Sequence, residues 1–140
     1  MLAAALLVTA ALAWWSRTRN GAIRPAAGAD GPTELHPVFE RLGVRAEAAD
    51  LTVVQFSTAF CAPCRTTRAR IQQMQTTRPG LAYVHVDAES HLDEVRELDV
   101  RRTPTLFYLR RDGSVLARSS GAPQPEQLAA LVDAHVRAQS

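Results

Sequence analysis

Apolar positions recur along the chain with two spacings, and the two alternate in a way that is typical of a domain built from strands and helices in turn. Runs of apolar and β-branched residues predict strands, and the last two runs flank Asp112-Gly113, a dipeptide favoured in hairpin turns. The predicted strands cover residues 51–57, 81–86, 105–109 and 115–117. Apolar residues at helical spacing predict helices over about 63–75, 90–98 and 125–136.

This β-α-β-α-β-β-α order predicts an α/β fold in which a central mixed sheet has helices on both faces. One more element is expected in front of it, because Leu35, Val38 and Phe39 have helical spacing. Pro37 interrupts that pattern, so a short edge strand in this stretch is an alternative. Ser90 is placed to cap the helix that follows it.

The first 16 residues are apolar and rich in alanine, and no charged residue precedes Arg17. As a helix this run would be about 24 Å long, which is shorter than the roughly 30 Å hydrocarbon core of a bilayer. Two tryptophans followed by arginines are nevertheless typical of an interfacial anchor with a basic flank. We therefore predict an N-terminal hydrophobic helix that anchors the chain in a membrane over 1–16, a flexible linker over 17–32 and a folded domain over 33–140.

Two other interpretations of the N-terminal run stay open. Ala11-Leu12-Ala13 resembles a signal-peptide cleavage site, although no positive charge precedes the apolar run. A buried helix of the folded domain is the other interpretation. For a single-pass anchor, the positive-inside rule places the arginine-flanked side, and with it the folded domain, on the cytoplasmic face. The extracytoplasmic side is the alternative.

Composition and charge limit the kinds of partner that the chain is expected to have. Hydrophobic residues make up 46% of the chain, which is enough for one ordinary core, and all 16 basic residues are arginine. The net charge of +2 is small and dispersed, so no nucleic-acid-binding surface is indicated. Two cysteines leave the redox compartment open, because such a pair can work in reducing or oxidising surroundings.

The candidate chemistry lies in Phe60-Cys61-Ala62-Pro63-Cys64, which holds both cysteines of the chain. The motif stands where a predicted strand gives way to a helix, so Cys61 is expected at the helix N-terminus. Unpaired N–H groups and the helix dipole favour negative charge there, and a thiolate is the nucleophile in disulfide exchange. Cys64 lies within one turn, and Pro63 suits the first turn of a helix. The spacing therefore indicates a dithiol redox site.

Two other functions for a CxxC motif have less support. Zinc usually takes four ligands, and the chain has no second CxxC. The histidines are scattered along the chain, at His36, His85, His91 and His135. A purely structural disulfide gains little stability across so short a loop. We therefore predict no metal site.

Four landmarks give the chain a resemblance to the thioredoxin family over about residues 51–136. They are Cys61-Ala62-Pro63-Cys64, Val86-Asp87, Thr103-Pro104-Thr105 and Asp112-Gly113, in the order that the family has them. The resemblance implies a thioredoxin-like fold. With its N-terminal run, the chain is similar to membrane-tethered thioredoxin-like proteins of bacteria.

The resemblance also implies a role for each matching residue. Cys61 would attack the substrate disulfide, and Cys64 would resolve the mixed disulfide that results. Pro104 matches a proline that follows a cis peptide bond, and Thr103 would offer its backbone to an extended substrate segment. An apolar surface that contacts the substrate would come from Phe60, Ala62 and Pro63.

Two positions near the motif depart from the family's pattern. Gln55 stands where many thioredoxins bury an aspartate that takes the proton of the resolving thiol, and Tyr83 stands where many carry a lysine. A glutamine cannot accept that proton, so Gln55 is a substituted proton-transfer position that either slows resolution or is neutral. Both charged residues are replaced together, and this is physically reasonable, because either one alone would be an unpaired buried charge, which is costly. Arg101 and Arg102 are interpreted as a solvated pair, with stabilisation of the thiolate or a preference for acidic substrates as the alternatives.

The sequence thus predicts a thiol–disulfide oxidoreductase, a thioredoxin-type protein-disulfide reductase. It is expected to need no cofactor beyond the Cys61–Cys64 dithiol. The expected partners are proteins with disulfides, a thioredoxin reductase or membrane electron donor, and the lipid bilayer through residues 1–16. One alternative is a non-catalytic binding or chaperone module in which the CxxC is idle. Another is a dedicated redox carrier in cytochrome or exported-protein maturation.

Overall fold

The computed structural model describes residues 2–26 and 35–136. Within these residues, five strands form one sheet in the order β1-β5-β4-β2-β3; β2 and β3 are parallel, and the other neighbouring pairs are antiparallel. The strands are β1 (Ile23–Pro25), β2 (Leu51–Ser57), β3 (Leu81–Asp87), β4 (Thr105–Arg110) and β5 (Val115–Ser120). The helices are α1 (Leu2–Arg19), α2 (Pro37–Arg41), α3 (Ala62–Gln75), α4 (Leu92–Glu97) and α5 (Pro125–His135), with a short 3-10 helix at Ala46–Ala48.

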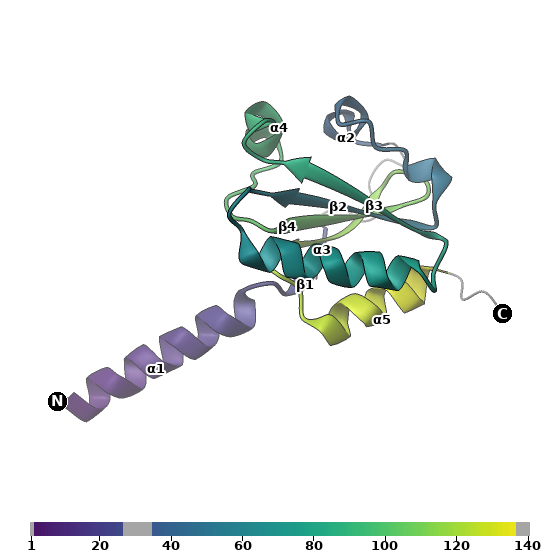
Figure 1. Ribbon diagram of the computed structural model, residues 1–140. Helices are drawn as coiled ribbons and strands as arrows, with labels where there is room; N and C mark the ends of the chain where they lie inside the picture. Colours follow the sequence, from purple (N-terminus) through teal and green to yellow (C-terminus); the bar gives the residue numbers. More distant parts are fainter. Residues whose placement is uncertain (1, 27–34, 137–140) are drawn as a thin grey trace.

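Helices cover both faces of this sheet. Helices α3 and α5 lie on one face, and α2 and α4 lie on the other (Figure 1). The predicted α/β fold with a central mixed sheet is therefore confirmed. Each predicted strand and helix from residue 51 onward is present, with ends that differ from the prediction by a few residues.

Strand β2 is the centre of the core, and all seven of its residues are buried. Its apolar run fits this position, because a strand covered on both faces must be apolar on both. Leu51 and Val53 join the cluster under α3 and α5, whereas Val54 and Phe56 join the cluster under α2 and α4. The strand ends at Ser57, so the CxxC motif emerges from the centre of the buried sheet.

The N-terminus of α4 is not capped in the way that the sequence predicts. Helix α4 begins at Leu92, its N-cap residue is His91, and no side chain caps it. The Ser90 hydroxyl instead donates a hydrogen bond of 2.7 Å to Asp87 Oδ2 in the turn after β3. The prediction that Ser90 caps this helix was wrong because the N-cap position falls one residue later, at His91.

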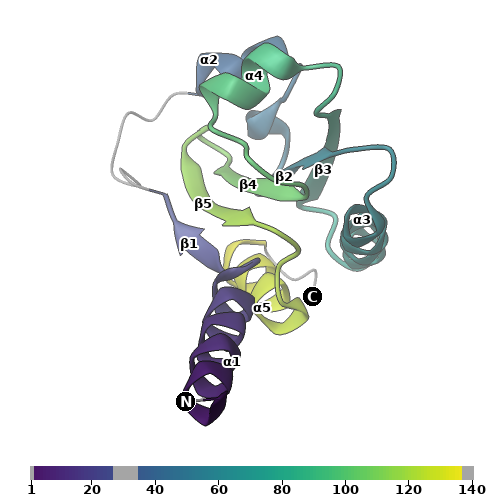
Figure 2. The ribbon, with the colours of Figure 1, turned by 90° about the vertical axis from the view of Figure 1, so that its left-hand side faces the viewer.

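The segment predicted as a linker contains secondary structure. Helix α1 continues to Arg19, and β1 pairs with β5 so that Ile23 lies opposite Ser119. Figure 2 shows β1 beside β5, with α1 leading away from this edge of the sheet. A three-residue strand has no readable periodicity, and it forms because β5 offers an edge with unpaired backbone groups. Residues 27–32 of the predicted linker lie outside the described residues, and the division into three domains stays a prediction.

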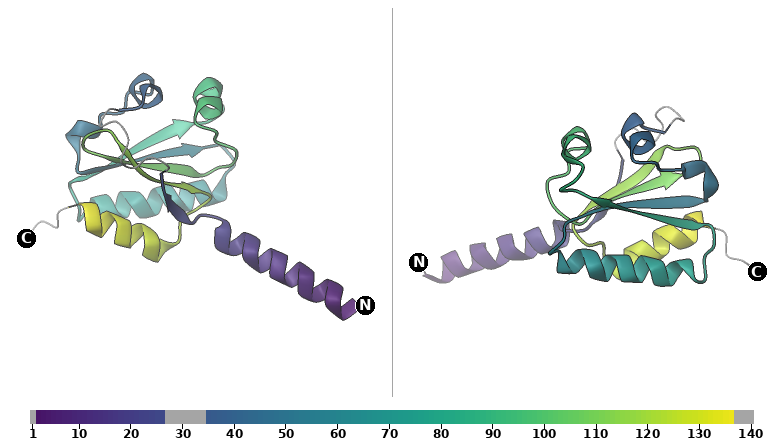
Figure 3. Two further views of the ribbon diagram at one scale, coloured as in Figure 1. Left: turned by 180° about the vertical axis from the view of Figure 1, so that it is seen from behind. Right: turned by 45° about the horizontal axis from the view of Figure 1, so that its top comes forward.

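The N-terminal helix does not support the predicted membrane anchor. Among the described residues, no helix is both long enough and apolar enough to cross a membrane. Arg17 and Arg19 lie in the last turn of α1, so its uncharged part is about 22 Å long against a core of roughly 30 Å. This finding contradicts three predictions: the transmembrane helix over 1–16, the single-pass membrane localisation and the lipid partner. Both views in Figure 3 show α1 projecting away from the sheet.

Candidate redox site

The two cysteines form a disulfide at the N-terminus of α3, with their Cα atoms 5.2 Å apart. Cys61 is the N-cap residue of this helix, and its Sγ accepts a hydrogen bond of 3.2 Å from the Cys64 backbone N–H. The helix therefore directs an N–H group of its first turn at the sulfur of Cys61. Cys61 is 9% exposed and Cys64 is 3% exposed, so the first cysteine is the more accessible one.

The turn before β4 lies beside the cysteine loop. The peptide bond between Thr103 and Pro104 is cis. The hydroxyls of Thr58 and Thr103 lie 3.4 Å apart, which joins this turn to the loop that precedes Cys61. Within the described residues, the backbone N–H and C=O of Thr103 have no hydrogen-bond partner.

The residues around the disulfide include an exposed aromatic side chain. Phe60 is 97% exposed, although large aromatic side chains are mostly buried in folded proteins. Ala62 and Pro63 are also exposed, and they lie in the first turn of α3. The three residues form an uncovered apolar rim next to Cys61.

Gln55 lies directly beneath the motif and is completely buried. Its Nε2 donates two hydrogen bonds of 3.0 Å, one to the Cys64 carbonyl and one to Ser57 Oγ. Its Oε1 accepts a hydrogen bond of 3.1 Å from the Tyr83 hydroxyl. Every proton of this amide is used, so a neutral network occupies the position where the family resemblance leads one to expect charged groups.

A second polar feature, which the sequence analysis missed, is a cavity of about 320 Å³ beside Cys64. Arg68 of α3 and His85 and Asp87 of β3 line it. Burial and the Arg68 guanidinium lower the pKa of His85 below its ordinary value of 6.5, while Asp87 acts in the opposite direction. His85 lies opposite Gln55 in the parallel pairing of β2 and β3, and this register would have placed His85 close to the cysteine motif.

No metal site is visible in the described part of the chain. Within residues 2–26 and 35–136, no three His, Cys, Asp or Glu side chains gather closely enough to hold an ion.

Comparison with known proteins identifies the family. The family model described as Thioredoxin matches residues 39–134, which is well over half of the chain. The chain belongs to the thioredoxin family. The match includes the cysteine motif, the cis-proline turn and the helices on both faces of the sheet.

The curated thioredoxins that resemble this chain match it over only part of their own length. Thioredoxin H4-1 of Oryza sativa subsp. japonica is 33% identical over 86 residues, which are 59% of this chain and 65% of that protein. Thioredoxin-2 of Pyricularia oryzae is 35% identical over 83 residues, which are 59% of this chain and 47% of that protein. The chain thus spans between about half and two thirds of the length of these thioredoxins.

Solved structures have the same fold. The X-ray structure of Fasciola hepatica thioredoxin covers 69% of this chain and 90% of its own, with 25% identity and a TM-score of 0.59. A mutant thioredoxin from Halobacterium salinarum covers 82% and 99%, with 19% identity and a TM-score of 0.61. These structures support the thioredoxin fold, and neither they nor the curated relatives support the narrower resemblance to membrane-tethered bacterial proteins.

Tyr83 provides a test of the neutral network beneath the cysteine motif. Burial raises the pKa of Tyr83 to about 12, although the Arg68 guanidinium acts in the opposite direction, and burial also raises the pKa of Tyr108. Neither tyrosine should therefore ionise at pH 10 in the folded chain, and stability should fall as the pH rises from about 10 through the raised pKa. Absorbance at 295 nm during a pH titration measures this.

The control for this titration is the same chain unfolded in urea, where both tyrosines should ionise near pH 10. Replacing Tyr83 by phenylalanine should lower the free energy of unfolding by about 1 kcal/mol, because Gln55 Oε1 loses its donor. A tyrosine that ionised at pH 10 in the folded chain would contradict the burial of these hydroxyls.

Proposed function

We propose that this chain is a thiol–disulfide oxidoreductase that reduces disulfides in proteins. The observation that supports it most directly is the Cys61–Cys64 disulfide at a helix N-terminus, beside a turn in which the Thr103 backbone N–H and C=O have no partner among the described residues. The pair itself carries the two electrons, and no cofactor is required. The dithiol form is restored by an electron donor such as a thioredoxin reductase.

In the first step, the Cys61 thiolate attacks one sulfur of the substrate disulfide. The Cys61–substrate S–S bond forms, the substrate S–S bond breaks, and one substrate sulfur leaves as a thiolate that takes a proton from solvent. Cys61 has this role because it is the more exposed cysteine and because the Cys64 N–H points at its sulfur. The electron-attracting helix N-terminus stabilises the thiolate before attack.

In the second step, Cys64 loses its proton and attacks Cys61 in the mixed disulfide. The Cys61–Cys64 bond forms, and the second substrate sulfur leaves as a thiolate that is then protonated. The substrate has gained two electrons and two protons, and the dithiol has lost them. Gln55 lies against the Cys64 carbonyl and cannot accept a proton, so this proton goes to solvent through the cavity beside Cys64.

The turn and the apolar rim position the substrate. The free N–H and C=O of Thr103 pair with an extended segment next to the substrate cysteine, as in the addition of a strand to a sheet edge. Phe60, Ala62 and Pro63 contact the apolar side chains of that segment. Pro104 holds the turn in place, since its carbonyl accepts a hydrogen bond of 2.7 Å from Gly121.

The experiment that tests this proposal counts thiols on both partners. The chain is reduced, freed of reductant and mixed with insulin, whose disulfides are a general protein substrate. Its two cysteines should be oxidised as one insulin disulfide is reduced. The control is the double variant Cys61→Ser, Cys64→Ser, which should leave insulin oxidised. If the chain kept both thiols in the presence of insulin and of glutathione disulfide, it would be a binding module with an idle CxxC.

A further inference from the structure

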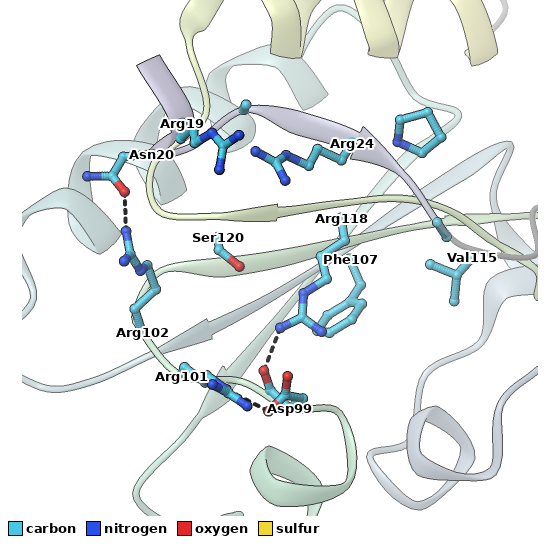
Figure 4. A pocket seen from close by; sticks show the side chains of 13 residues that line it. Arg19, Asn20, Arg24, Asp99, Arg101, Arg102, Phe107, Val115, Arg118 and Ser120 are labelled. Atoms are coloured by element: carbon cyan, nitrogen blue, oxygen red, sulfur yellow. Dashed lines mark hydrogen bonds and ion pairs between the residues drawn. The ribbon is translucent and has the colours of Figure 1, made fainter. Parts of the chain in front are cut away.

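A pocket of about 890 Å³ lies between β1, β5 and the segment that precedes the cis-proline turn. Its wall is basic: the arginines that line it are Arg19, Arg24, Arg101, Arg102 and Arg118. We name it the arginine pocket. Figure 4 shows Arg19 and Arg24 on the β1 side, Arg101 and Arg102 on the opposite side, and Arg118 against Phe107 between them. The Arg118 guanidinium carbon lies 5.0 Å from the centre of the Phe107 ring.

The positive charge of the chain is concentrated here. Five arginines line the pocket, whereas the net charge of the whole chain is only +2. Asp99 is the only carboxylate among the described lining residues, and Arg101 Nε already binds its Oδ1 at 2.8 Å. Arg118 donates to the carbonyls of Leu98 and Asp99, which hold its position without neutralising it. The pocket therefore presents a fixed positive field.

One pair of these arginines lies at directly opposed positions on two neighbouring strands. Arg24 and Arg118 are cross-strand partners in the β1–β5 register, and like charges in this position repel. Arg24 is exposed, and its side chain has no hydrogen bond or ion pair with any described residue. A carboxylate between the two guanidinium groups would remove the repulsion and form charge-assisted hydrogen bonds.

The pocket is continuous with the turn that would receive a substrate. Arg102 directly precedes Thr103, and its carbonyl accepts a hydrogen bond of 2.6 Å from Thr105 Oγ1. On the opposite wall, Ser120 is followed by Gly121, which donates its N–H to Pro104. A strand advances about 3.3 Å per residue, so a peptide paired with Thr103 reaches the pocket within a few residues.

We propose that the arginine pocket binds an acidic segment of the protein substrate, a few residues from the cysteine that Cys61 attacks. This inference rests on the proposed function, because the same peptide occupies both places. The N-terminal segment takes part directly, since β1 supplies Arg24 and the end of α1 supplies Arg19. Asn20 fixes the opposite wall by accepting a hydrogen bond from Arg102. The pocket selects among substrates by charge, and the disulfide exchange itself is unchanged.

The test compares two disulfide peptides of equal length, one with several glutamates beyond the cysteine and one with glutamines in their place. The reduced 140-residue chain should reduce the acidic peptide about tenfold faster at low salt, and the ratio of the two rates should shrink as salt is added. In the variant Arg24→Glu, the ratio should fall to one or below. The matched control is Arg45→Glu, an exposed arginine near the start of β2, and it should keep the ratio.

Binding is measured separately from reduction. The two measurements together distinguish a failure of this inference from a failure of the proposed function. Fluorescent forms of both peptides, with serine in place of cysteine, are titrated with the chain, and the acidic form should bind more tightly. Equal reduction and equal binding of the two peptides would overturn the pocket but keep the oxidoreductase. Preferential binding without any reduction would keep the pocket and remove the proposed function. Tighter binding of a single-stranded oligonucleotide than of the acidic peptide would reassign the pocket to nucleic acid and overturn this inference.

Discussion

Replacing Cys64 by serine should leave a protein that captures its substrates covalently, and replacing Cys61 by serine should leave one that captures nothing. The first variant keeps the sulfur at the helix N-terminus and can form the mixed disulfide, but it has no second thiol to break that bond. The second variant keeps only Cys64, which is 3% exposed. Both variants should lose multiple-turnover reduction of insulin.

Capture is measured on a non-reducing gel after the reduced variants are mixed with oxidised insulin. The Cys64→Ser variant should give one new band that disappears when dithiothreitol is added. A wild-type chain handled in the same way is the control, because it should pass through the mixed disulfide without accumulating it. Equal capture by the two variants would contradict the proposed order of attack, and capture by Cys61→Ser alone would reverse it.

The parts of the fold that the sequence predicts are those with local signals. Strand β2 is rich in apolar and β-branched residues, and α3 begins directly after Cys61 with Pro63 in its first turn, so both could be placed from their own residues. The order of strands and helices then restricts the topology to a mixed sheet, because parallel neighbours need a helical crossover. The cysteine pair and the cis-proline turn are adjacent in space because β2 and β4 are neighbours in that sheet.

The parts that could not be predicted depend on contacts between distant segments. Ile23–Pro25 has no alternation of apolar and polar residues, and it becomes a strand only beside β5. The arginine pocket likewise joins the end of α1 to residues far along the chain, such as Arg101 and Arg118, so composition alone indicated a dispersed charge. The membrane prediction failed for another reason: hydropathy at the N-terminus resembles an anchor, but the apolar part of α1 is too short.

At the redox site, the sequence shows that Gln55 stands where the family's pattern has a buried aspartate. It does not show which contacts Gln55 makes in place of that aspartate. Gln55 and Tyr83 could be identified as departures from the family's pattern. Their hydrogen bond, and the two that Gln55 donates, appear only in three dimensions. These bonds make Gln55 a structural support for the Cys64 carbonyl. The pKa of a carboxyl group placed there would be raised by burial.

Replacing Gln55 by aspartate should speed the second step of disulfide exchange by roughly tenfold or more at neutral pH, because a carboxylate can accept the Cys64 proton. The same change should lower the free energy of unfolding by about 2 to 4 kcal/mol, because the Cys64 carbonyl loses its donor and a carboxyl group enters a fully buried site. Stopped-flow measurement of substrate release from the mixed disulfide, and urea unfolding, give the two quantities.

The pH dependence of that variant separates the two effects. A buried aspartate has a folded-state pKa above its unfolded value of about 3.9, so the folded chain holds the proton more tightly. Stability should therefore be closest to wild type near pH 4 and should fall as the pH rises towards the raised pKa. The matched control is Gln55→Asn, which has the same shorter side chain without the carboxyl group. If Gln55→Asp released substrate no faster than Gln55→Asn, the glutamine would be neutral for resolution, and the proton of Cys64 would reach solvent without a buried base.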